Sequence, residues 1–172
     1  MTLFDAIKAR RSIRRFSDQP VDENSIRKIL EAGIYAPSAG NLQPWKYYVV
    51  TNKAMLVKLS EAAYSQIAVT ESAGCIVVCI DKIQASSRYG ERGQGLYAIQ
   101  DTAAAMQNML LVIHELGLGA CWIGAFTEAK VCKILNLSSQ FRPVAILAFG
   151  HPTEVDAMPP RKPLESVVEW IR

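Results

Sequence analysis

The segment from Ile99 to Glu115 constrains the fold most, because it predicts a helix that is apolar on nearly all of its faces. Apolar side chains recur there with the spacing of one helix face, and Gly117 provides a typical helix end. Alanine, methionine, leucine and valine also occupy the other faces of the segment. A helix of this kind lies at the centre of a core or is shared with a partner chain.

The elements around this helix predict an α+β fold. Two early helices are expected, one opened by a capping box between Thr2 and Asp5 and the other capped by Asp22. Because the elements do not follow a steady βαβ order, we expect helices packed around a central mixed or antiparallel sheet. The apolar patterns predict helices over residues 2–9, 22–33, 55–63, 99–115 and 128–135, and strands over residues 46–50, 75–80, 120–123 and 144–149.

Two internal segments are expected to be loops. Residues 37–44 are rich in proline, serine, glycine and asparagine, and residues 81–97 carry Gly90, Gly93 and Gly95 among polar side chains. The second of these loops is expected to be exposed and mobile. Prolines at positions 152, 159, 160 and 163 predict an extended tail from about residue 152.

Length and composition predict a single domain over residues 1–172. Half of the residues are hydrophobic, which is enough for one sizeable core. The net charge of +3 is too small to indicate a nucleic-acid partner. The chain has no apolar signal segment or membrane-length stretch, and its four cysteines form no C-x-x-C pair. We therefore expect a cytoplasmic protein, not bound to membranes, with its cysteines in the core.

A basic cluster near the N-terminus is the first candidate binding site. Its members, in the sequence R-R-S-I-R, are Arg10, Arg11, Ser12 and Arg14. Guanidinium groups match the oxygens of a phosphate in pairs, and a serine hydroxyl adds a further donor. The cluster suits one fixed phosphate of a small molecule, but a solvated basic face and a nucleic-acid patch remain alternatives.

The loop A-P-S-A-G-N-L-Q-P-W is the second candidate. Two prolines stiffen it, its glycine permits close approach of the backbone, and its two amides carry both donors and acceptors. Such groups suit the edge of a heteroaromatic ring, although a plain connection between a helix and a strand would use similar residues. The candidate residues are Pro37, Ser38, Ala39, Gly40, Asn41 and Gln43.

The segment G-L-G-A-C-W-I-G at residues 117–124 is the third candidate. It follows a helix rather than a strand and lacks the G-x-G-x-x-G spacing, so it is not a Rossmann fingerprint. Either Gly124 simply ends a short strand, or its backbone amide faces a flat ligand. No spacing typical of a catalytic triad or a metal site occurs, so we assign no catalytic and no metal-binding residue.

Taken together, these blocks resemble the nitroreductase family. The R-R-S-I-R start, the A-P-S-A-G-N-L-Q-P-W loop and the G-L-G-A-C-W-I-G segment are followed by I-L-A-F-G-H-P and R-K-P-L-E-S-V-V. The resemblance implies an α+β fold and an intertwined homodimer with two FMN sites at the subunit interface. It also implies an enzyme in which NADH or NADPH reduces FMN. A nitroaromatic, quinone or similar acceptor then takes the electrons by a ping-pong mechanism.

The resemblance also implies a role for each candidate block. Residues 10, 11, 12 and 14 would hold the phosphate and ribityl chain of FMN, and the loop at 37–43 would be laid against the flavin by the partner subunit. The backbone at Ile123 and Gly124 would face the flavin ring. Either Arg161 or Lys162 would reach the phosphate from the tail.

The resemblance fades between Tyr64 and Ala73, where Gln66 is a candidate contact to the flavin. Helical segments that cover the substrate in longer members are missing from the sequence. Three alternatives stay open: an FMN enzyme with another reaction (reductive dehalogenation, dehydrogenation or flavin fragmentation), a non-enzymatic flavin redox sensor, and a nucleic-acid binder.

Overall fold

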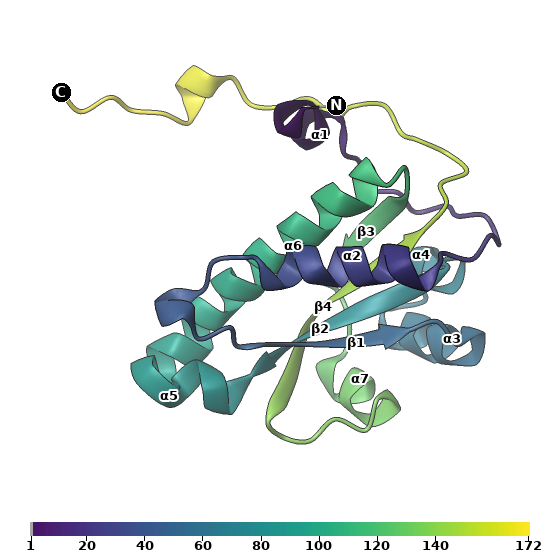
Figure 1. Cartoon of the computed structure of the whole chain (residues 1–172), viewed down its shortest axis with the longest axis horizontal. Coiled ribbons are helices and arrows are strands. Elements are labelled where there is room, and N and C mark those ends of the chain that lie inside the picture. Colours follow the sequence, from purple (N-terminus) through teal and green to yellow (C-terminus); the bar gives the residue numbers. More distant parts are fainter. Residues whose placement is uncertain (1) are drawn as a thin grey trace.

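A four-stranded sheet forms the centre of the computed structural model, which describes residues 2–172 (Figure 1). Its strand order is β1-β2-β4-β3, and all three neighbouring pairs are antiparallel. The sheet is therefore antiparallel, one of the two predicted forms. The strands are β1 (Trp45–Val50), β2 (Gly74–Asp81), β3 (Gly119–Ile123) and β4 (Phe141–Gly150).

Helices cover both faces of this sheet. Successive side chains of a strand point to opposite faces, so the unbroken apolar run of β2 is buried on both sides. Ile76 and Val78 pack against one helical layer, whereas Cys75 and Val77 pack against the other. The first layer contains α2 (Glu23–Ile34) and α6 (Ala98–Glu115), and the second contains α3 (Lys53–Ala62), α4 (Ile67–Thr70) and α7 (Glu128–Ile134).

Helix α6 is the central helix that the sequence predicts. Met106, Met109 and Ile113 are fully buried against the sheet, and the Asn108 amide donates to the Ala32 carbonyl of α2 at 3.1 Å. Three of the four cysteines are also buried, as expected. No helix between residues 2 and 172 is both long and apolar enough to cross a bilayer.

Residues 81–97 are not a loop, so this prediction is wrong. They form α5 (Lys82–Arg92) and one π-helical stretch, η2 (Gly93–Tyr97), which leads directly into α6. The Asp81 carboxylate starts α5 by accepting hydrogen bonds from the amides of Ile83 and Gln84. The glycines of this segment do not form a mobile loop. Gly90 interrupts α5, and Gly93 allows η2 to pack against Ala85 of α5.

The β1 side of the sheet is open. Among the residues that the structure describes, strand β1 pairs only with β2, and its Val49 side chain is exposed. Beside it, a cavity of ≈ 620 Å³ lies between β1 and α2, with Ile26 and Leu30 among its apolar walls. Residues of strong strand propensity form this edge, and no further strand of residues 2–172 pairs with it.

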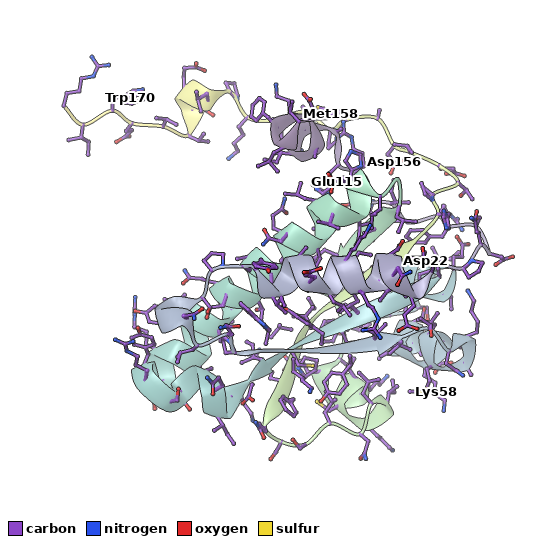
Figure 2. All side chains as sticks on the ribbon, viewed as in Figure 1. Asp22, Lys58, Glu115, Asp156, Met158 and Trp170 are labelled. Carbon is purple, nitrogen blue, oxygen red and sulfur yellow. The ribbon has the colours of Figure 1, made fainter. Side chains whose placement is uncertain are left out.

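Both ends of the chain leave apolar side chains in solvent. The capping box of α1 (Leu3–Ala9) forms as predicted, but Leu3, Phe4 and Ile7 are exposed. The tail after residue 152 is extended, as expected, apart from one short turn, η3 (Leu164–Ser166). Figure 2 shows Trp170 on the far part of the tail, away from the body of the molecule. These exposed ends indicate surfaces that one chain alone does not bury.

Candidate functional site

The basic cluster lines one hollow between the N-terminal segment and the start of the tail. This hollow has a volume of ≈ 290 Å³. The predicted tail cation that reaches it is Arg161 rather than Lys162. We call it the arginine hollow; its walls are Arg10, Arg11, Ser12, Arg14, Asp156, Ala157, Pro159 and Arg161.

Backbone pairing with the sheet fixes the position of this cluster. Ser12 forms a parallel bridge with Ala120 of β3, and the Ile13 amide donates to the Ala120 carbonyl at 2.8 Å. Ile13 and Phe16 are buried, which anchors the segment and leaves the side chain of Arg14 exposed. The cluster is thus held by main-chain hydrogen bonds and by two apolar anchors.

The arginines of the hollow have different local partners. Arg11 Nη1 donates to the carbonyl oxygens of Lys8, Ala9 and Arg10 at 2.7, 2.9 and 2.8 Å, so it closes the end of α1. Arg14 Nη1 lies 4.0 Å from an oxygen of Asp156. Arg11 therefore adds positive charge to the hollow, but its Nη1 is already engaged by backbone carbonyls.

The electrostatics of the hollow favour an anion. Partial burial of Arg10, followed by the nearby cations Arg161 and Arg11, lowers the pKa of its guanidinium. Four arginines and only one carboxylate, that of Asp156, line the same space. Because like charges gathered in this way repel one another, a ligand with two negative charges would stabilise them.

Strand β3 lies within the third candidate block and leads from this hollow to Gly124. Ser12 pairs near the start of β3, and Gly124 follows its end. At the usual rise per strand residue, Ala120 and Gly124 are about 13 Å apart. A Cβ at Gly124 would meet no atom within 4 Å, so its backbone is open to a ligand. Gln66 lies beside this position, because its amide donates to the Ala125 carbonyl at 3.2 Å.

The loop at residues 37–43 has a defined conformation. Gly40, Asn41 and Gln43 all have positive φ, at 58°, 56° and 50°. The Ser38 hydroxyl accepts from the Gln43 amide at 3.0 Å, and the Gln43 side chain donates to Asn41 Oδ1 at 3.2 Å. Such left-handed backbone is rare outside glycine, so these hydrogen bonds hold an unusual and polar surface in place.

An acid in α6 anchors the same loop. Asp101 Oδ1 accepts a hydrogen bond of 3.0 Å from the Ala39 amide. Burial raises the pKa of the Asp101 carboxyl, and the hydrogen bond from Ala39 acts against that increase. Asp101 is not among the predicted site residues, because nothing in the sequence distinguishes it from its polar neighbours Gln100 and Thr102.

The loop at residues 37–43 and the N-terminal segment that carries the arginine cluster lie toward opposite ends of α6 (Figure 1). Asp101, which holds the loop, is in the first turn of α6. Ile113 and His114, near the last turn, share a smaller cavity with Arg10. The rise along α6 from Asp101 to Ile113 is about 18 Å. One chain therefore does not bring the loop to the arginine hollow, whereas Trp122 of β3 shares a cavity with Ile99 and Thr102 at the same end of α6 as the loop.

The sequence profile of the nitroreductase family matches residues 7–74 and 68–151. The chain belongs to the nitroreductase family. The two matched stretches meet at the region where the resemblance fades, and this agrees with a short form of the fold. The predicted fold class is confirmed: a helix-covered antiparallel sheet of this family.

Several known proteins are similar to this chain over nearly its whole length. The NADH dehydrogenase of Thermus thermophilus is 36% identical, over 94% of this chain and 92% of that protein. The oxygen-insensitive NADPH nitroreductase of Salmonella typhimurium is 31% identical, over 92% of this chain and 69% of its own length. The solved structure of the Vibrio harveyi NADPH:FMN oxidoreductase complexed with NAD⁺ matches with a TM-score of 0.90 at 28% identity, covering 99% of this chain and 77% of that one.

Proposed function

We propose that this protein is an FMN-dependent oxidoreductase that uses NADH or NADPH to reduce nitroaromatics, quinones or similar acceptors. Relatives named NADPH-flavin oxidoreductase, FMN reductase and NADPH nitroreductase support this assignment. The observation that carries it is the arginine hollow, where four arginines and Ser12 surround one space suited to a phosphate.

The residues present fit FMN. Arg10, Arg14 and Arg161 would hold the phosphate, with Ser12 donating from its hydroxyl. The open backbone at Gly124, about 13 Å along β3, would meet the ring end of the cofactor. When bound, FMN supplies the hydride and electron transfer that no side chain here can perform. Cations near a reduced flavin stabilise its negative charge.

We also propose that the protein is an intertwined homodimer. Asn41, Gln43 and the rest of their loop are too far along α6 to reach the hollow of their own chain. A second copy would bring its loop to that site, and the one interface of the dimer would hold two FMN molecules, one at each arginine hollow. The exposed apolar side chains of α1 and of the tail support such an interface. The single domain over 1–172 and the cytoplasmic location stay predictions.

Replacing Arg10 tests the phosphate assignment. In Arg10→Ala the charge-assisted hydrogen bonds to a phosphate are lost, and each such bond contributes about 1.5–3 kcal/mol. We expect the affinity for FMN to fall by about one to two decades. Riboflavin has no phosphate, so its affinity should be weak and almost unchanged. Flavin fluorescence titrations measure both constants.

Arg15→Ala is the matched control, since Arg15 pairs with Glu71 at 2.7 Å and does not line the hollow. Its affinity for FMN should equal that of the wild type. Equal losses for FMN and riboflavin in Arg10→Ala would show that Arg10 acts through folding. A wild-type protein that does not bind FMN would refute the proposed function.

We expect a ping-pong kinetic mechanism. The nicotinamide and the acceptor must both reach one FMN at the same site, so the oxidised nicotinamide leaves before the acceptor enters. Initial rates at several fixed acceptor concentrations should give parallel double-reciprocal lines. Intersecting lines would require both substrates to be bound at once and would contradict a shared site.

A further inference from the structure

Two arginines of helix α5 are each placed against a tyrosine, one of α5 itself and one of η2. The Cζ atom of Arg88 lies 5.3 Å from the ring centroid of Tyr89, and that of Arg92 lies 5.3 Å from the ring centroid of Tyr97. Arg92 Nε also donates to the Tyr97 hydroxyl at 2.8 Å. The two rings meet edge to face, with centroids 5.3 Å apart. The four side chains form one connected surface, which we call the Arg–Tyr patch.

The charges of the Arg–Tyr patch are not neutralised within the chain. Neither Arg88 nor Arg92 forms an ion pair with an acid of residues 2–172. Both side chains are exposed, and Glu91 is the one acid between them in sequence. Contacts to the rings limit the freedom of both guanidinium groups, so less entropy is lost when they bind an anion.

This patch adjoins the loop that we assign to the flavin site. A Cβ placed on Gly40 would lie 2.7 Å from the Tyr89 hydroxyl and 3.2 Å from Arg88 Nη1. The Gln84 amide of α5 also donates to the Leu42 carbonyl at 3.0 Å. Whatever the loop covers in the dimer, the Arg–Tyr patch therefore borders the same space.

We propose that the Arg–Tyr patch binds the adenosine 2′-phosphate end of NADPH, so that the enzyme prefers NADPH to NADH. The proposal rests on the proposed function, because the nicotinamide end must reach FMN. Arginine forks match a phosphate dianion in pairs, and both aromatic rings and arginine planes are groups on which adenine can stack. NADH lacks the 2′-phosphate and makes only the stacking contact.

A binding experiment without turnover tests the patch directly. Adenosine 2′,5′-bisphosphate and AMP are titrated by calorimetry into the wild-type protein and into the double variant Arg88→Gln/Arg92→Gln. We expect the bisphosphate to bind the wild type at least about tenfold more tightly than AMP does, and this difference to disappear in the double variant. The difference should also shrink as salt is raised.

Arg27→Gln is the matched control, because Arg27 is an exposed arginine of α2 that pairs with Glu23. It should bind both nucleotides as the wild type does. Equal affinities of the bisphosphate and AMP in the wild type would overturn the proposal. Tighter binding of a single-stranded RNA than of the bisphosphate would also overturn it, and would assign the patch to nucleic acid.

A flavin-reduction experiment distinguishes failure of the patch proposal from failure of the proposed oxidoreductase function. Under anaerobic conditions, the double variant should need at least about tenfold more NADPH for half-maximal reduction, with the NADH requirement unchanged. The flavin spectrum should be the same in both proteins. If the flavin is bound and reduced but both nicotinamides are affected equally, only the patch proposal fails. A protein without flavin would show instead that the proposed function fails.

Discussion

Removal of residues 164–172 should dissociate the dimer while leaving Arg161 in place. Five apolar side chains of this segment are exposed in the single chain. Burying one such side chain contributes about 1.5–3 kcal/mol, so even two of them account for about two decades in the dimer dissociation constant. We expect sedimentation equilibrium to show an increase of at least about hundredfold in that constant. The five side chains are Leu164, Val167, Val168, Trp170 and Ile171.

The shortened chain should also lose FMN, although every residue of the arginine hollow is still present. The loss of FMN follows because the partner subunit supplies the loop around Gly40. The loop of the same chain does not reach its own hollow. Replacing Glu169 and Arg172 by glutamine is the control, since it changes charges on the same segment but keeps its apolar groups. A shortened chain that remains a flavin-loaded dimer would contradict the role of the tail.

A methyl group at Gly93 should destabilise the protein far more than one at Gly95. A Cβ on Gly93 would overlap the backbone carbonyl oxygen of Ala85, which cannot move without shifting α5. Overpacking of this kind typically costs about 1–3 kcal/mol. A Cβ on Gly95 would meet nothing within 4 Å, so Gly95→Ala is a matched control in the same helical stretch. Alanine favours a helix over glycine by up to about 1 kcal/mol, so this control should be neutral or stabilising.

Urea unfolding curves measure both free energies. Gly93→Ala should also lower NADPH affinity if α5 shifts, because Arg88 and Tyr89 lie on that helix. Similar free energies of unfolding for the two alanine variants would mean that α5 and η2 can separate without loss of stability. Residues 82–97 would then be mobile, as the sequence predicted.

The same glycines explain where sequence reasoning stopped. The strands and α6 could be predicted because apolar spacing reports directly on burial. A glycine in the sequence indicates only that the backbone is free to adopt unusual conformations, and not which conformation it adopts. At Gly90 this freedom is used for a break in α5, with φ 54° and ψ −136°, whereas at Gly93 the missing side chain permits contact with Ala85. Composition alone does not distinguish these uses from a loop.

The candidate site shows a similar division. The gathering of the N-terminal basic residues in one hollow could be predicted because they are close neighbours in the chain, and their binding of a phosphate stays a prediction. Asp156 and the choice of Arg161 over Lys162 could not, since they depend on the path of an extended tail. The location of the 37–43 loop, at the far end of α6 from the hollow, depends on tertiary packing through Asp101.

The open side of β1 links self-association of this protein to its quality control in the cell. Its sequence, W-K-Y-Y-V-V, is a six-residue run of high strand propensity with one charge and neither proline nor glycine. Such segments stack readily into cross-β fibrils when their backbone groups are unpaired. Lys46 is the only gatekeeper on the strand. A chain whose β1 edge stays uncovered can thus pair strand to strand with another copy, and it would depend on chaperones to keep the two edges apart.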